Sequence, residues 1–303
     1  MLKKIKRHGI KGAARIGLLL FRRRLEPLQK HYDLFRLRNA QRYVNPSPAE
    51  LLAIESGLES LGAKLVDFNP DPEAFNFFVE QGWFPLDYHG GIHSAVWREK
   101  LLEHFIAKDL LGLDNFGPSD VYLDIASCGS PWARILREKL QINAYAIDLS
   151  PVPEMYKSLP YYRSEDATHS SFPNQSVIGA SLQCAYEMFT GDSDIKLIHE
   201  LKRILAPGGK AVIAPLYTHT HYCAYSTPEY FGMGHSDPKA KEYLRVDCYG
   251  IPSSRKYDAC ELKKRVLDTI VSMGMSYRLH VLRNKEMFGE GVYCHFVLEI
   301  RND

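Results

Sequence analysis

The sequence predicts an α/β protein with an open, mostly parallel β-sheet and helices on both faces. From Val121 onward, short apolar runs alternate with helical runs, which is the pattern of βαβ units. A Pro-Gly-Gly turn at 207–209 separates one helical run from the next apolar run. Near the C-terminus, two strand-like runs at about 276–283 and 292–300 are joined by a glycine-containing loop, which indicates an antiparallel pair at the sheet edge.

The α/β domain is expected over 113–303. Its strand-like and helical runs are, in order, VYLDIA, PWARILREKL, INAYAID, PVPEMYKSL, VIGASLQC, DIKLIHELKRIL and AVIAPLY. A further helix is expected near 260–273. The stretch at about 217–257 belongs to no such unit, so we expect it to be an insertion.

A helical cap is expected before this domain, over 48–112. The break NPSP places Pro48 at the first position of a helix, where proline is well tolerated. A second break, NPDP, precedes the helical run EAFNFFVEQ, and an aromatic loop, GWFPLDYHGGIH, follows at 82–93. Apolar residues at helical spacing then predict a helix over about 94–111.

The basic character of the 303-residue chain is concentrated in an N-terminal arm, residues 1–47. The net charge is only +2, yet residues 1–42 contain 13 Lys/Arg and 2 Asp/Glu, against 25 and 34 in the remainder. The apolar run from Ile16 to Phe21 is too short for a membrane span, which needs ~20 residues. Three arginines follow it and no small-residue cleavage site appears, so we do not expect export.

Three interpretations of the arm stay open. In the first, residues 1–42 form an amphipathic helix that lies on an anionic membrane surface. In the second, the arm is a docking element for an acidic partner or for nucleic acid. In the third, it is a solvated helix that packs on the body of the protein. The six cysteines show no CxxC pair, as expected of reduced thiols. We therefore expect a cytoplasmic protein, or one associated with the cytoplasmic face of a membrane.

The loop after the first strand of the α/β domain, in YLDIASCGSPWA (122–133), indicates what the domain binds. It contains only Gly129, without the GxGxxG that a dinucleotide pyrophosphate requires, and no GxxxxGK[ST] occurs elsewhere. An adenosine without phosphates is compatible with the acids that follow the strands. The carboxylate of Asp148 can accept hydrogen bonds from ribose hydroxyls, and that of Asp166 from an adenine amino group. The carboxylate of Asp124 can pair with an ammonium group.

Five segments in this order resemble class I S-adenosylmethionine-dependent methyltransferases, particularly those grouped as domain type 11. They are VYLDIASCGS, YAIDLSP, EDATHSSFPNQSV, SLQCAYEMF and LKRILAPGGKAVIAPLY. The resemblance covers about residues 100–216 well and 258–300 in general layout. It implies a Rossmann-like fold, S-adenosylmethionine as cofactor, and methyl transfer as the reaction.

The resemblance also implies a set of cofactor-binding residues. These are Asp124, Ala126, Ser127, Cys128, Gly129, Asp148, Leu149, Asp166, Ala167 and Cys184. The chain departs from the family at Ala126, Cys128 and Ser130, where glycine is common, and left-handed turns cost more without glycine. Asp124 and Asp148 also have a simpler interpretation, as caps of backbone amides.

Methyl transfer to a hydroxyl benefits from a general base near the attacking oxygen. Candidate bases are His219 and His221 after the fifth strand, Glu187 beyond the fourth, and His93 in the aromatic loop. No metal site is expected, because alternate residues of a strand point to opposite faces and the spacing of these histidines to Cys223 matches no strong template. A helix N-cap explains the GDSD at 191–194 more simply than Mg²⁺.

The acceptor is expected to be a hydroxyl of a sugar, glycan or other small molecule. No NPPY-like segment follows the fourth strand, which disfavours nucleic-acid amines, and the acidic body would repel a phosphate backbone. Two alternatives stay open: a non-catalytic S-adenosylmethionine-binding scaffold, and an RNA or protein methyltransferase that uses the arm. The sequence leaves the oligomeric state undetermined.

Overall fold

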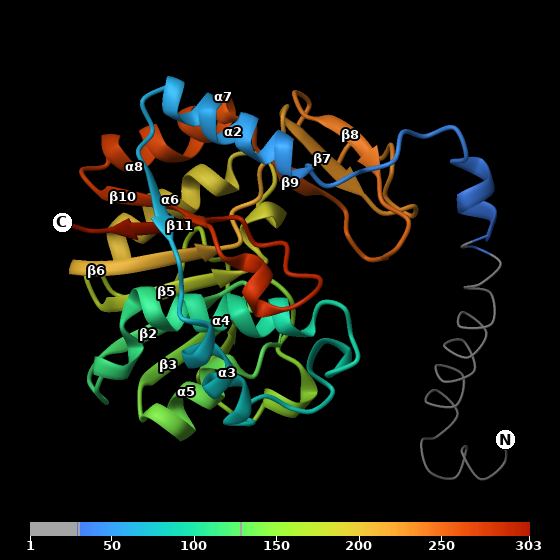
Figure 1. Ribbon diagram of the computed structural model, residues 1–303. Helices are drawn as coiled ribbons and strands as arrows, with labels where there is room; N and C mark the ends of the chain where they lie inside the picture. Colours follow the sequence, from blue (N-terminus) through green and yellow to red (C-terminus); the bar gives the residue numbers. More distant parts are fainter. Residues whose placement is uncertain (1–28, 30, 128) are drawn as a thin grey trace, which may run out of the picture. The chain divides into compact units, whose positions relative to one another are not determined.

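A computed structural model describes residue 29, residues 31–127 and residues 129–303 (Figure 1). The chain divides into two compact units. One comprises the described residues of 45–223 and 255–303, and the other comprises the described residues up to 44 together with 224–254. The segment 224–254 lies within the expected insertion. The expected boundaries of the arm and the cap, at 47 and 112, stay predictions.

The larger unit contains an eight-stranded sheet in the order β1-β10-β11-β6-β5-β2-β3-β4. These strands are β1 Leu65–Phe68, β10 Ser276–Leu282, β11 Phe296–Arg301, β6 Leu205–Ala214, β5 Val177–Gln183, β2 Val121–Ile125, β3 Asn143–Asp148 and β4 Tyr162–Ser164. β11 is antiparallel to both of its neighbours, and every other pair is parallel. The predicted fold class, an open and mostly parallel α/β sheet with an antiparallel C-terminal pair, is confirmed.

The strand β1 was not expected, because only helices were predicted between the two N-terminal breaks. It pairs in parallel with β10, with Leu65 opposite Leu279, and so extends the sheet beyond the C-terminal antiparallel pair. Its sequence, LVDF, has only four residues. Periodicity cannot identify so short a strand, which acquires its hydrogen bonds from β10.

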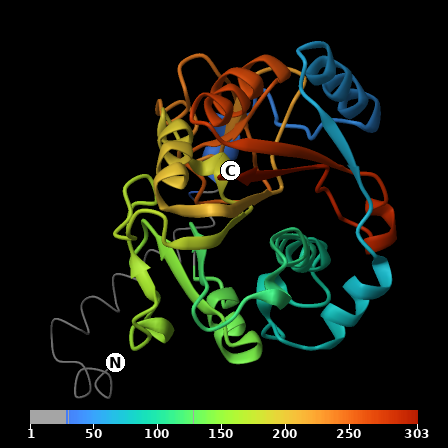
Figure 2. The ribbon, with the colours of Figure 1, turned by 90° about the vertical axis from the view of Figure 1, so that its left-hand side faces the viewer.

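Helices cover both faces of the sheet, with α4 and α5 on one face and α6 and α8 on the other (Figures 1 and 2). The helices of this unit are α2 Pro48–Ser60, α3 Pro72–Glu80, α4 Trp97–Leu111, α5 Trp132–Leu140, α6 Ser193–Ile204, α7 Ala259–Leu262 and α8 Asp268–Ser272, with a π-helical turn at Lys263–Leu267. The core between α4, α5 and the sheet contains Leu102, Tyr122 and Trp132, all fully buried.

The starts of α2 and α3 are set by local sequence. Ser47 and Glu50 form a reciprocal capping box around the amides at the start of α2, and Pro48 occupies its first position. Asp71 accepts a hydrogen bond from the amide of Glu73 at the start of α3. The two breaks expected from NPSP and NPDP are therefore helix N-termini.

The smaller unit is built around a second sheet, in the order β8-β7-β9. These strands are β7 Cys223–Ser226, β8 Lys241–Leu244 and β9 Ser254–Lys256, and β7 and β9 carry the chain into and out of the unit. Within the unit, Arg42 forms a parallel bridge to Leu244, and the ring of Tyr43 packs on Tyr225 with centroids 4.8 Å apart.

Most of the basic arm lies outside the described residues, which exclude 1–28 and 30. The expected membrane surface through residues 1–42 therefore stays a prediction. Among the residues that the structure describes, none of the helices combines the length and the apolar composition that crossing a membrane requires.

Candidate functional site

The loop after β2 adopts left-handed backbone at Ala126 (φ 54°) and Gly129 (φ 78°). It is held at its base, where the amide of Ser127 donates to the carbonyl of Ile147 over 3.1 Å. A Cβ at Gly129 would come within 2.8 Å of Pro153 Cγ, so this position requires glycine for space as well as for backbone conformation. Ala126 adopts a conformation that glycine usually supplies. Cys128 lies outside the described residues.

A cavity of about 180 Å³ opens beside this loop, at the carboxyl ends of β2 and β3. Its lining comprises Ser127, Gly129, Ala146, Asp148, Ser150, Pro151, Val152, Pro153, Tyr162 and Arg163. Asp148 ends β3, and its Oδ1 accepts a hydrogen bond from the amide of Ser150 over 2.7 Å. The neighbouring Leu149 is exposed. Ligand pockets of ~300–1,000 Å³ hold whole drug-sized molecules, so this cavity is large enough for part of a nucleoside.

Asp124, on β2, is a buried acid with an unsatisfied oxygen. Its side chain is only 1% exposed, and its Oδ2 has no hydrogen-bond partner within the part of the chain that the structure describes. Burial, and secondarily the negative charge of Asp148, raise the pKa of Asp124 well above its usual value. Such a carboxyl is suited to a cationic or hydrogen-donating ligand, because a partner would relieve the cost of its burial.

Asp166 and Ala167 follow β4, apart from the lining of this cavity. Asp166 is exposed, and its Oδ1 accepts hydrogen bonds from the amide and hydroxyl of Thr168 over 2.9 and 2.8 Å. This is an Asx-type turn, which positions the loop without any ligand. Ala167 is buried. Their role at an adenine stays a prediction.

A second set of polar side chains gathers where β5 and β6 end. Cys184 follows β5, and its Sγ lies 3.4 Å from Glu187 Oε1 and 3.2 Å from the hydroxyl of Tyr217. Glu187 is 5% exposed, and its Oε2 has no hydrogen-bond partner among the described residues. Burial, and then the charge of Glu187, raise the pKa of Cys184 to about 12, so at neutral pH it is a thiol and a poor nucleophile.

Helix α4 contributes three buried charged residues to the same region, Glu99, Lys100 and Glu103. Lys100 Nζ lies 2.7 Å from Glu103 Oε1, and burial raises the pKa of Glu103. Glu99 Oε2 accepts hydrogen bonds from the amides of Tyr293 (3.0 Å) and Cys294 (3.3 Å), and burial raises the pKa of Glu99 to about 7.

We call these residues the polar cluster: Glu99, Lys100, Glu103, Cys184, Glu187, Tyr217 and Tyr293. The rings of Tyr217 and Tyr293 stack with centroids 6.1 Å apart, and Lys100 Nζ lies 5.5 Å from the Tyr293 centroid. Cys184 and Glu187 are predicted from the sequence, whereas the α4 residues are not, because WREK resembles an ordinary solvated helix turn. No local signal marked their burial, because charged residues are spread along much of α4, WREKLLEHFIAKDLL.

The aromatic loop packs against the start of α5. Phe84 stacks on Trp132, the first residue of α5, at 5.7 Å between centroids. The Tyr88 hydroxyl lies 2.8 Å from His104 Nε2, and burial lowers the pKa of that histidine well below its usual value. His93 is exposed on the turn before α4, so the structure does not bring it into the polar cluster.

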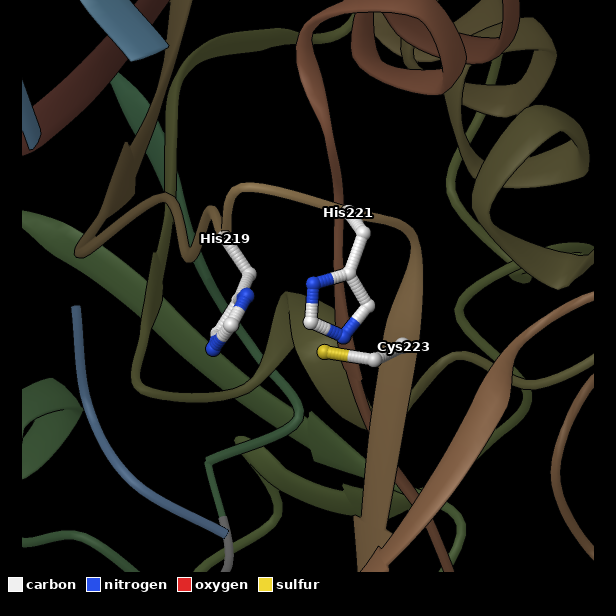
Figure 3. Close-up of side chains that lie close together, drawn as sticks. All are labelled: His219, His221 and Cys223. Atoms are coloured by element: carbon white, nitrogen blue, oxygen red, sulfur yellow. The ribbon is translucent and has the colours of Figure 1, made fainter. Parts of the chain in front are cut away.

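His219 and His221 lie on the connection between β6 and β7. The chain bends at 220–222, so the alternation of a strand does not apply to this segment. The bend places the ligand atoms of His219, His221 and Cys223 within 4.8 Å of one another (Figure 3). The three side chains thus lie on the same side of the chain, which the sequence analysis had argued against.

The GDSD segment does not form the simple helix cap that was expected. Asp192 precedes α6 but makes no side-chain capping hydrogen bond. Asp194 is fully buried and pairs with Arg255 at 2.5 Å and with Arg265 at 2.7 Å. Two arginines thus neutralise this carboxylate, which makes it a structural ion-pair residue and no Mg²⁺ ligand.

Comparison with known proteins gives similarity in overall fold only. No protein-family model and no curated protein matches the chain. The 1,6-didemethyltoxoflavin-N1-methyltransferase of Burkholderia thailandensis is 13% identical, with a TM-score of 0.45 over 87% of this chain and 93% of its own. The geranyl diphosphate C-methyltransferase of Streptomyces coelicolor A3(2) is 13% identical, with a TM-score of 0.38 over 77% and 99%.

A third similar structure is an S-adenosylmethionine-dependent methyltransferase of Methanosarcina mazei, 13% identical, with a TM-score of 0.39 over 61% of this chain and 92% of its own. All three are methyltransferases, yet similarity at this level says nothing of this chain's substrate.

Proposed function

We propose that this protein transfers a methyl group from S-adenosylmethionine to a hydroxyl of a small molecule such as a sugar or glycan. The observation that carries the proposal is the cavity lined by the loop after β2, the end of β3 and β4, with Asp148 on its lining and Gly129 against Pro153. A carboxylate there suits the paired hydroxyls of a ribose. The loop offers no glycine-rich cradle for a pyrophosphate, which favours a cofactor without phosphates.

The residues at this edge fit the parts of that cofactor. Asp148 would hold the ribose, the buried and unsatisfied Asp124 would meet the ammonium of the methionine moiety, and Asp166 would receive the adenine amino group. Ser127 and Gly129 would lie against the cofactor through their backbone. When bound, S-adenosylmethionine supplies an electrophilic methyl group on a sulfonium.

The polar cluster supplies what the acceptor needs. An aliphatic hydroxyl attacks poorly unless a base removes its proton during the reaction. Glu187 is the best-placed candidate of those suggested by the sequence, because it is buried beside the end of β5 and has an unsatisfied oxygen that could accept that proton. Burial of the surrounding side chains would keep water away from the reacting atoms.

Calorimetric titration of the full-length chain with S-adenosylmethionine and with S-adenosylhomocysteine tests the proposal. We expect both to bind, and Asp148→Ala to weaken binding at least tenfold, or ~1.4 kcal/mol. Asp71→Ala is the matched control, because it also removes an Asx hydrogen bond to an amide two residues on, but at the start of α3. Absence of binding by a folded protein, or equal affinity in Asp148→Ala, would overturn the assignment.

Mass spectrometry identifies the acceptor. A pool of sugars, glycans and secondary metabolites is incubated with the protein and isotopically labelled S-adenosylmethionine, and products carrying the labelled methyl group are sought. Label on a hydroxyl oxygen supports the proposed acceptor class. Label on nitrogen or carbon would refute the hydroxyl assignment while leaving the cofactor assignment intact, and binding without any turnover would favour the scaffold alternative.

A further inference from the structure

The bend between β6 and β7 gathers three side chains of the types that bind transition metals. The ligand atoms of His219, His221 and Cys223 all lie within 4.8 Å of one another, and a ring nitrogen of His221 points toward the sulfur of Cys223 (Figure 3). We propose that these three residues bind a divalent transition-metal ion, with zinc as the best match. The inference goes beyond methyl transfer and does not depend on it.

The donor set selects the class of metal. Two imidazoles and a thiolate are ligands that zinc prefers, whereas Mg²⁺ and Ca²⁺ require oxygen ligands. Bond lengths of ~2.0–2.1 Å to nitrogen and ~2.3 Å to sulfur place the three ligand atoms of a tetrahedral site roughly 3.3–3.6 Å apart. The observed separations of at most 4.8 Å need to shorten by about 1 Å or a little more, which small side-chain rotations achieve.

The hydroxyl of Thr220 lies within hydrogen-bonding distance of both imidazoles. Its Oγ1 lies 3.2 Å from Nδ1 of His219 and 3.2 Å from Nδ1 of His221. If both rings bind the metal through Nε2, each Nδ1 carries a hydrogen, and one hydroxyl oxygen has two lone pairs to accept both. Metal-binding histidines usually have such a partner on the other nitrogen, which fixes tautomer and ring orientation.

Two hydrogen bonds hold the backbone of the segment that carries the three residues. The amide of His219 donates to the carbonyl of Tyr257 over 2.8 Å, and the amide of Tyr222 donates to Asp258 Oδ2 over 3.1 Å. Cys223 is fully buried as the first residue of β7, whereas His221 is partly exposed. The site is thus anchored at the sulfur and accessible at one histidine. Three protein ligands with access from solvent leave a fourth position for water or a ligand.

A nearby carboxylate makes the charge of this region favourable for a cation. Glu50 on α2 lies close enough to His219 and His221 to interact with them electrostatically. The same interaction would favour a bound metal ion. Metal ligation would use the nitrogen lone pairs of both histidines, so neither could then act as the general base. The role of base would remain with Glu187.

The test is metal titration of the full-length chain, with any affinity tag removed and resident metal stripped by chelation. We expect one equivalent of zinc by calorimetry and elemental analysis. One equivalent of cobalt should produce the visible bands of a tetrahedral site and a near-ultraviolet thiolate charge-transfer band. Cys223→Ser should abolish the thiolate band and weaken zinc binding at least tenfold, as should His219→Ala. Thr220→Val should weaken it by about tenfold while retaining the thiolate band.

Two controls separate this site from general metal binding by histidine or cysteine. Cys260→Ser and His199→Ala alter exposed residues of the same two types, and both variants should bind zinc as the parent does. If thermal unfolding shows that Cys223→Ser or His219→Ala does not fold, the partly exposed His221→Ala decides the question by the same readouts.

A folded parent without stoichiometric metal binding would overturn the proposal, as would equal binding by the parent and the folded ligand variants. Titration of the metal-free protein with S-adenosylmethionine is a separate measurement. Failure there would refute the proposed function and leave the metal site intact, whereas loss of metal binding with normal cofactor binding would do the reverse.

Discussion

The carboxyl edge of the main sheet carries acidic residues in two different settings. At the ends of β2 and β3, Asp124 and Asp148 lie close enough for one charge to raise the pKa of the other. At the ends of β5 and β6, Glu103 has Lys100 at 2.7 Å, while Glu187 lies beside Cys184. Both regions contain a buried acid with an unsatisfied oxygen, Asp124 in the first and Glu187 in the second, but only the second region supplies a buried cation.

The contrast indicates that the two regions have different roles. An unsatisfied buried acid is costly to the folded protein, so its presence is best explained by a ligand that supplies the missing donor. A buried ion pair is internally balanced, and it holds neighbouring side chains in a fixed arrangement without any ligand. The β2–β3 edge is therefore suited to binding a cation, and the polar cluster to positioning a reacting group.

The largest expected effect comes from removing the cation of the polar cluster. Lys100→Met should lower the free energy of unfolding by ~3–5 kcal/mol, because it leaves Glu103 buried without its partner. Chemical denaturation of the full chain measures this. The double variant Lys100→Met/Glu103→Gln should recover part of the loss, and a double-mutant cycle gives the coupling. A single-variant loss below ~1 kcal/mol would show that the ion pair does not hold this region together.

An intermediate effect is expected at Glu187. Glu187→Gln keeps the size of the side chain but cannot accept a proton, so the rate of methyl transfer to the identified acceptor should fall at least about a hundredfold, or ~2.7 kcal/mol. Affinity for S-adenosylmethionine should not change. Glu290→Gln, on an exposed loop, is the control and should retain the parent rate. An unchanged rate in Glu187→Gln would remove this residue from the mechanism.

The smallest effect concerns protons taken up or released at Asp124. Its pKa is raised in the free protein, and an ammonium bound beside it would favour the charged form and lower that pKa. Binding should therefore release up to one proton, and affinity should rise with pH between the two pKa values, by at most ~1.4 kcal/mol per pH unit.

Calorimetry in buffers of different ionisation enthalpy measures this proton release. The variant Asp124→Asn has no proton to release at this position, so its heat of binding should depend less on the buffer. Equal proton release by the parent and by Asp124→Asn would contradict the assignment of the ammonium to this acid. The unsatisfied oxygen of Asp124 would then not be explained by an ammonium ligand.

Much of the fold was predictable because its signals are local. The alternation of strand and helix, the N-caps at Ser47 and Asp71, and the acid that ends β3 each depend on a few consecutive residues. The left-handed loop after β2 shows the limit of this approach. Glycine was expected there, yet Ala126 adopts the same backbone region, since the surrounding strands impose a shape that the residue type alone disfavours.

The polar cluster was only partly predictable. Cys184 and Glu187 follow a recognisable strand, but Glu99 and Glu103 belong to a helix whose charges look like a solvated face. Their burial results from packing against β5 and β6, which are distant in sequence. Hydrophobic periodicity describes one helix at a time and carries no information on what covers its charged face.

The sequence by itself determined the alternation of strands and helices from β2 onward and the acids near the ends of two neighbouring strands. These properties follow from interactions within a few residues, which a linear pattern records. Only the tertiary structure decided that LVDF joins the sheet beside β10, that α4 buries its charges, and that a bend turns His219, His221 and Cys223 toward one another. Each of these depends on contacts between remote segments, or on a bend that replaces the alternation of a strand.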